Sequence, residues 1–152
     1  MTDPDQACGR APSCGNDYLS RISGPLMDRF DLRIEVPVAR FQDLSLPASG
    51  ERSHVIAKRV LAARTLQDTR YAKTEIATNS DLTGDAMDRL IQMEEDAKTY
   101  IEQAAIKLNL TARGFHRVIR VARTITDLEQ SEHVARHHVG EAISFHNSAP
   151  AA

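Results

Sequence analysis

The sequence predicts a mostly α-helical protein: a bundle of about four to five helices, preceded by a short segment with one strand. Apolar residues recur at helical spacing through most of residues 53–146. Only at 32–36 do Leu, Ile and Val alternate with Arg and Glu, and a proline follows, which is typical of a short strand. With 152 residues, 41% of them hydrophobic and 26% charged, the chain has the composition of one globular domain with an appendage.

Changes in composition divide the chain into parts. Residues 1–15 are rich in Gly, Pro, Asp and Cys and are expected to be disordered or a loop. Residues 16–40 hold the predicted strand, and 41–52 have the Pro, Ser and Gly content of a linker. The helical domain is expected to span 53–146, followed by a mobile tail at 147–152.

Five helices are expected in the helical domain, over about 53–70, 83–93, 94–108, 111–128 and 131–146. Thr83, Thr111 and Ser131 are the predicted N-caps, because each precedes a periodic apolar run. The second and third helices are either separate or continuous. In the first helix Ile56, Val60 and Ala63 share one face. Toward the C-terminal end of the helix, the same face is continued by the polar residues Gln67 and Arg70.

The charge pattern is more informative than the net charge of −2. Residues 81–102 are acidic, whereas 113–123 contain four arginines and no lysine, which favours binding of phosphate from nucleotide or DNA. No apolar run approaches membrane-spanning length and no signal peptide is present, so a cytoplasmic location without membrane contact is expected. Cys8 and Cys14 alone cannot complete a four-ligand zinc site.

Arg29 is the first candidate for chemistry. It lies between Asp28 and Asp31, where a predicted turn meets the predicted strand. An arginine at such a rim is well placed to reach another molecule. The alternative is a surface ion pair with one of the neighbouring aspartates.

The fourth helix carries the second set of candidates. Arg113, Arg117 and Arg120 are expected to form a stripe opposite its apolar face, and Arg123 is a further candidate for phosphate or DNA contact. The simpler interpretation is the solvated face that any amphipathic helix needs. On the first helix, Gln67 and Arg70 are interpreted either as ordinary exposed residues or as an interdomain contact.

The histidines are weaker candidates. They are His133, His137, His138 and His146, all near the last helix. No H-E-x-x-H pattern is present and a third convergent ligand is not evident, so no metal site is expected. His138 lies on the apolar face of its helix and is expected to pack in the core.

Four stretches, taken in order, resemble the C-terminal region of the magnesium-chelatase-like AAA+ ATPases of the ComM/YifB family. They are residues 18–31, containing Ser-Gly-Pro-Leu-Met-Asp-Arg-Phe-Asp; the pattern Val60, Ala63, Arg64, Gln67 and Arg70; residues 110–128, containing Ala-Arg-Thr-Ile-Thr-Asp-Leu; and residues 138–145. The resemblance covers roughly residues 7–146.

This resemblance implies an AAA+ lid from a hexameric bacterial ATPase that remodels DNA by branch migration. It implies that Arg29 is an arginine finger offered to a neighbouring subunit, and that Arg113, after Thr111 and Ala112, is the sensor-2 arginine. ATP and Mg²⁺ would be bound by the AAA+ core of a longer parent protein. No G-x-x-x-x-G-K-[ST] motif occurs in this chain, so the fragment alone is expected to bind neither cofactor and to lack ATPase activity.

Two other functions remain open from the sequence. The fourth and fifth helices, joined by a short turn, could form a DNA-binding module whose arginine stripe contacts the backbone. Alternatively, the parent protein could be the ATPase motor of a metal chelatase, which predicts partner subunits with a metal-binding domain.

Overall fold

The structure is a computed structural model, and it describes residues 21–22, 26, 29–34, 36, 41–42, 45–47 and 50–147. Its elements are α3 (Ser53–Tyr71), the 3₁₀ turn η3 (Asn79–Asp81), α4 (Gly84–Leu90), α5 (Glu95–Lys107), α6 (Ala112–Leu128) and α7 (Arg136–Asn147). The predicted mostly α fold is confirmed. The predictions for residues 1–15, for Cys8 and Cys14, and for the tail beyond 147 lie outside the described residues.

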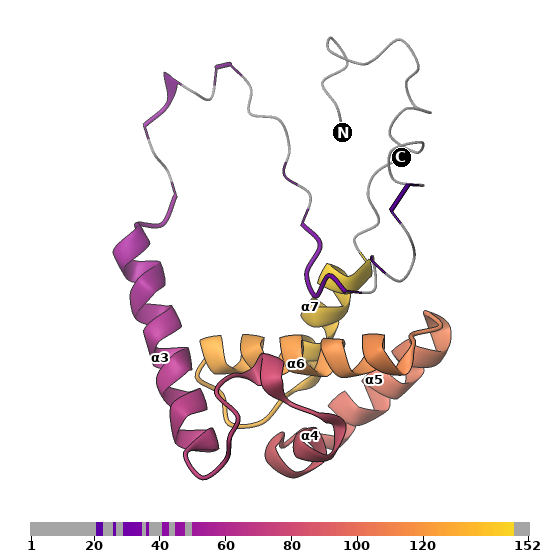
Figure 1. Ribbon diagram of the computed structural model, residues 1–152. Coiled ribbons are helices and arrows are strands. Elements are labelled where there is room, and N and C mark those ends of the chain that lie inside the picture. Colours follow the sequence, from indigo (N-terminus) through magenta and orange to yellow (C-terminus); the bar gives the residue numbers. More distant parts are fainter. Residues whose placement is uncertain are drawn as a thin grey trace.

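Helix α6 lies at the centre of the helical domain (Figure 1). It packs against α7, α3 and η3, while α5 packs against α7. The core around it consists of small and branched apolar side chains, of which Ala97, Ala122, Val134 and Val139 are completely buried. Because α6 has neighbours on several sides, all of its residues after Arg113 are at least partly covered.

Helix α3 stands at one end of α6 and joins the domain through its C-terminal half only (Figure 1). Ala63, Gln67 and Tyr71 are buried, whereas residues 51–61 are all exposed. Ile56 and Val60 are 41% and 46% exposed. The range of this helix was predicted correctly. Its burial is the opposite of what the sequence pattern suggested: the C-terminal half of the face, which contains polar residues, is buried, and the apolar N-terminal half is exposed.

The ends of α5 and α6 are fixed by the same hydrogen-bond pattern. Asn109 and Gln130 adopt left-handed backbone conformations, with φ of 50° and 57°. At the end of α6, the Ser131 N–H donates to Thr126 O at 3.0 Å and the Gln130 N–H donates to Asp127 O at 3.1 Å. Such paired bonds satisfy the last carbonyls of a helix and end it.

The prediction that Ser131 caps the last helix is wrong. The Ser131 N–H already closes α6, and α7 begins at Arg136. The intervening chain is held by a parallel bridge between Met93 and Val134. The Val134 N–H donates to Gln92 O at 2.9 Å and Val134 O accepts from the Glu94 N–H at 3.0 Å. The same bridge separates α4 from α5, which resolves the two alternatives for those helices.

The described residues of the predicted strand, 32–34 and 36, form no strand. Ile34 and Val36 are 68% and 83% exposed. A single strand leaves its backbone groups unsatisfied unless a sheet pairs with it, and the described part of the chain contains no sheet for it to join. The Arg33 N–H instead donates to Phe145 O, near the end of α7, at 3.1 Å.

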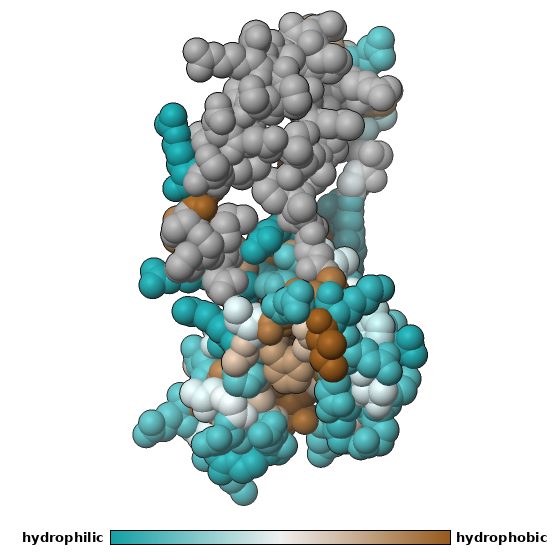
Figure 2. Space-filling model, turned by 90° about the vertical axis from the view of Figure 1, so that its right-hand side faces the viewer, coloured by the Kyte–Doolittle hydropathy of each residue, from teal (hydrophilic) through white to brown (hydrophobic). Residues whose placement is uncertain are grey.

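The surface of the helical domain is mixed in character. On the face that Figure 2 shows, apolar residues gather over a limited area and are surrounded by polar ones. No helix in the described part of the chain combines the length and apolar character that crossing a bilayer requires.

Candidate functional site

Arg113 lies at the start of α6 and is exposed. Thr111 is the N-cap, as predicted, and its Oγ1 accepts a hydrogen bond from the Gly114 N–H at 3.0 Å. Arg113 is the second residue of the helix, so its guanidinium adds to the positive end of the helix dipole. The start of a helix with an exposed arginine beside it favours an anion such as phosphate.

Arg117 and Arg123 are not part of an exposed stripe. Their residues are 2% and 1% exposed. The Arg117 Nη2 lies 3.2 Å from His146 Nδ1, and its Nε lies 3.5 Å from Asp31 Oδ1. The expected stripe fails because α6 is surrounded by other elements, so a polar side chain opposite its apolar face meets protein instead of solvent.

Arg120 is half-buried beside η3. Its Nη1 donates to the backbone oxygen of Ser80 at 3.0 Å. The bond anchors the side chain along the surface of the domain. Of the four α6 arginines, Arg113 is therefore the one that is exposed.

Arg123 belongs to a buried polar cluster around Asp127, which is completely buried. Its Nε and Nη2 donate to Asp127 Oδ1 at 3.1 and 2.8 Å. Its Nη1 and Nη2 also donate to the backbone oxygens of Glu132 and Ser131 at 2.7 and 2.9 Å. All of these donors are directed inward, so the structure contradicts the prediction that Arg123 contacts a surface phosphate.

The other side of this cluster comes from α3 and η3. Arg70 donates to both Asp127 oxygens, at 2.5 and 3.1 Å. Asn79 Nδ2 donates to Asp127 Oδ2 at 2.9 Å, and the Tyr71 hydroxyl donates to Asn79 Oδ1 at 2.6 Å. Arg70 is thus neither an ordinary exposed residue nor an interdomain contact, because it joins α3 to α6. Gln67 is buried and accepts from Arg64 at 3.1 Å.

Opposing effects set the protonation of this cluster. Burial by itself would raise the pKa of Asp127, but the hydrogen bonds from Arg70 and Asn79 and the positive charges around it hold that pKa below its usual value. Burial also lowers the pKa of Arg123 and raises the pKa of Tyr71. The cluster therefore holds an ionised carboxylate between two arginines, an arrangement that stabilises the domain and offers no open site.

Arg29 is exposed, and its N–H donates to Leu26 O at 2.9 Å in a turn. The suggested pairing with Asp31 is not formed, because the Asp31 carboxylate faces Arg117. Asp28 lies outside the described residues. Arg29 is therefore presented at the surface, on a segment that contacts the same helix that carries Arg113.

A carboxylate that the sequence analysis missed lies beside two histidines. The Glu129 Oε2 is 2.9 Å from His138 Nε2 and 3.3 Å from His137 Nε2, and one possible ligand atom of each residue lies within 4.8 Å of the others. Hydrogen bonds from both histidines lower the pKa of Glu129. Glu129 follows α6 and the histidines are in α7, so no single helical period connects them.

The hydrogen bonds of His138 disfavour a metal at this cluster. Its Nδ1 accepts from the Ala135 N–H at 2.9 Å, so the ring proton is on Nε2, which donates to Glu129. A metal on Nε2 would move that proton to Nδ1, where it would face another N–H. His138 is 1% exposed and acts as a cap at the start of α7.

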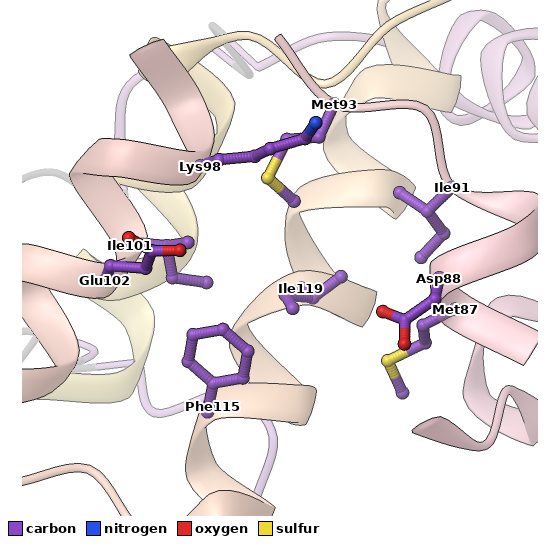
Figure 3. Close-up of a pocket in the computed structure, with 9 residues that line it drawn as sticks. All are labelled: Met87, Asp88, Ile91, Met93, Lys98, Ile101, Glu102, Phe115 and Ile119. Atoms are coloured by element: carbon purple, nitrogen blue, oxygen red, sulfur yellow. The ribbon is translucent and has the colours of Figure 1, made fainter. Parts of the chain in front are cut away.

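A cleft of about 330 Å³ opens between α4, α5 and α6 (Figure 3). Its lining is mainly apolar and includes Met87, Ile119 and Phe115. Figure 3 shows Asp88 and Glu102 on opposite sides of it. Two carboxylates and one lysine, Lys98, line the cleft, and their net negative charge does not favour the phosphates of a nucleotide.

Comparison with known proteins places the chain in a family. Residues 50–146 match the family model described as magnesium chelatase, subunit ChlI C-terminal, and residues 1–44 match the model for magnesium chelatase, subunit ChlI. The YifB proteins of Salmonella typhimurium and Escherichia coli, which carry no assigned function, are 38% and 37% identical to this chain over 129 residues. Competence protein ComM of Haemophilus influenzae is 35% identical over 129 residues.

These three alignments cover 84% of this chain and 25% of each relative. The chain thus spans about a quarter of the length of these curated relatives. Its match to the ChlI C-terminal model extends from before α3 to the last turn of α7. The chain belongs to the magnesium-chelatase-like family that includes YifB and ComM.

Proposed function

We propose that this chain is the C-terminal lid region of a hexameric AAA+ ATPase that remodels DNA, and that it supplies two arginines to ATP hydrolysis. The observation that carries the proposal is the position of Arg113. Among the four arginines of α6, Arg113 alone is exposed, and it stands at the helix N-terminus. ATP and Mg²⁺ would be bound by the nucleotide-binding core of the longer protein, because no phosphate-binding loop motif occurs in these 152 residues.

Arg113 is suited to sensing nucleotide. Its guanidinium can form two hydrogen bonds to phosphate oxygens, and the start of α6 adds a favourable dipole. Loss of the terminal phosphate on hydrolysis removes a charged partner. The lid would then change its position relative to the core, and this movement would drive the ring.

Arg29 is suited to act on a nucleotide bound by a neighbouring subunit. Phosphoryl transfer spreads negative charge over the transferred group, and an arginine supplied from another subunit stabilises that charge. Exposure of Arg29 in a turn supports this role, because a finger must extend beyond its own subunit.

A role in DNA remodelling agrees with the relationship to a competence protein. The alternative of an independent DNA-binding module is less well supported. Arg117 and Arg123, two of the four arginines that were candidates for DNA contact, are bonded inside the domain. We therefore propose that DNA is contacted by other parts of the ring. The family description leaves a chelatase motor as the second candidate function.

The test uses the full-length ATPase with Arg113→Ala and Arg29→Ala. We expect Arg29→Ala to leave ATP binding intact and to lower kcat by about a thousandfold. We expect Arg113→Ala to weaken the response to nucleotide, measured as a raised KM for ATP or a lowered kcat. The control is Arg89→Ala, which removes another exposed arginine, on α4. Arg113→Ala and Arg29→Ala variants that both behave like this control would refute the proposal.

A further inference from the structure

The segment that follows Arg29 is attached to α6 by an ion pair. Asp31 Oδ1 lies 3.5 Å from Arg117 Nε, and their side chains are 55% and 3% exposed. Arg117 Nη2 also lies 3.2 Å from His146 Nδ1. The Asp31 carboxylate lies at the outer edge of this buried guanidinium, so the two opposite charges attract each other.

The next two residues of the segment are also attached to the helical domain. Leu32 lines a cleft of about 370 Å³ together with side chains of α6 and α7, among them Val121, Leu128 and Phe145. The Arg33 N–H donates to Phe145 O at 3.1 Å. Residues 31–33, which we call the strap, are therefore joined to α6 by an ion pair and to α7 by a backbone hydrogen bond, and Leu32 faces a cleft that both helices line.

The strap lies between the two arginines of the proposed function. Arg29 is two residues before Asp31, and Arg113 is one helical turn before Arg117 on α6. A rigid-body movement of α6 would consequently move Arg117, the strap and the turn that carries Arg29. A lid that lacked the strap would leave Arg29 on a free segment.

We infer that the Asp31–Arg117 ion pair couples the nucleotide-sensing helix to the arginine finger, with Asp31 and Arg117 as positioning residues for Arg29. This inference rests on the proposed function. The inference also extends the proposed function. The position of Arg29, which acts on the neighbouring subunit, would then depend on the nucleotide state that Arg113 senses in its own subunit. Orientation of a catalytic group in this way acts on turnover more than on substrate binding.

The first experiment tests the attachment alone and uses the 152-residue chain. Hydrogen exchange of the Arg33 amide is followed by NMR in the wild type and in Asp31→Asn. We expect exchange to accelerate about tenfold in the variant, because loss of the ion pair frees the strap. The control is Glu141→Gln, which removes a carboxylate from the same cleft. If Arg33 exchanged at the same rate in the wild type and in Asp31→Asn, the claim that the ion pair holds the strap on the helical domain would be overturned.

The second experiment tests the coupling in the full-length ATPase. We expect Asp31→Asn to lower kcat about tenfold and to leave the KM for ATP within about twofold of the wild type. Asp31→Glu, which keeps the carboxylate, should restore most of the activity, and Glu141→Gln should not change it. If Asp31 acts through Arg29, adding Asp31→Asn to Arg29→Ala should cause no further loss.

The outcomes separate the two claims. A strong effect of Arg29→Ala with none of Asp31→Asn would overturn the coupling and leave the proposed function in place. An unaffected Arg29→Ala variant would overturn the finger and the positioning role with it. A double variant much slower than Arg29→Ala would show that Asp31 acts by another route, which also overturns the inference.

Discussion

Arg70, at the end of α3, forms a two-bonded ion pair with Asp127, at the end of α6, at 2.5 and 3.1 Å. The two residues are 57 positions apart in the chain. Asp127 is completely buried, and Arg123 on the same helix contacts its Oδ1 from another direction. This pair fixes α3, whose first half is exposed, to the rest of the domain.

Asp127→Asn should strongly destabilise the domain. The substitution preserves the shape of the side chain but leaves two arginines without their buried anion, a change that typically costs about 3 to 5 kcal/mol. The free energy of unfolding in urea, followed by circular dichroism, measures the effect. The matched variant Asp88→Asn removes an exposed carboxylate and should change stability by less than about 0.5 kcal/mol. Similar values for the two variants would show that the cluster contributes little.

Acid should weaken the domain through the same residue. The pKa of Asp127 is lower in the folded state than in the unfolded state, so its ionised form stabilises the fold above the unfolded pKa of about 3.9. That contribution is lost as the pH falls through the lower, folded-state value. The difference in unfolding free energy between wild type and Asp127→Asn should therefore be constant near neutral pH and shrink below about pH 4. A difference that stayed constant throughout would contradict this.

The sequence predicted the helices well because apolar residues recur at helical spacing along most of them. The start of the last helix was predicted wrongly because it depends on contacts between distant segments. Val134 bonds to Gln92 and Glu94, which keeps the chain before Arg136 extended. The residues around Ser131 contain no local pattern from which these bonds to Gln92 and Glu94 could be predicted. The N-cap was therefore placed too early in the chain.

The candidate site was predicted less completely, for a related reason. Helical periodicity identifies a polar face, but it does not say whether solvent or protein meets that face. Arg113 is exposed because it is in the first turn, whereas Arg117 and Arg123 are further along a helix that is covered on several sides. Glu129 was missed because it meets His138 across the turn that ends α6.

Two arginines of α6 should respond differently to the same substitution. Arg123→Ala removes bonds to Asp127 and to the backbone oxygens of Ser131 and Glu132, and should cost about 3 kcal/mol of stability. Arg113→Ala removes an exposed side chain and should change stability by less than about 0.5 kcal/mol. Thermal and urea unfolding of both variants measure this difference. A destabilised Arg113→Ala variant would show that Arg113 is part of the packing.

Removing the imidazole of His138 should destabilise α7. Its Nδ1 accepts from the Ala135 N–H, so His138→Leu leaves that donor without its acceptor and should cost about 1 to 2 kcal/mol. His138→Gln retains an oxygen that can accept from the same N–H and should cost less. The free energies of unfolding of the two variants, compared with the wild type, test the capping role. Equal losses would indicate that His138 acts through packing alone.

Zinc should not stabilise the domain through Glu129, His137 and His138. The acceptor role of Nδ1 assigns the His138 proton to Nε2, the atom that a metal would need. Nitrogen NMR of the neutral ring should show the proton on Nε2 and none on Nδ1. Equimolar zinc should leave both signals and Tm unchanged, because a ligand raises Tm only when it binds the folded state. A rise in Tm that required both histidines, with loss of the Nε2 proton, would instead establish a metal site. The first turn of α7 would then have to rearrange to release the Ala135 N–H.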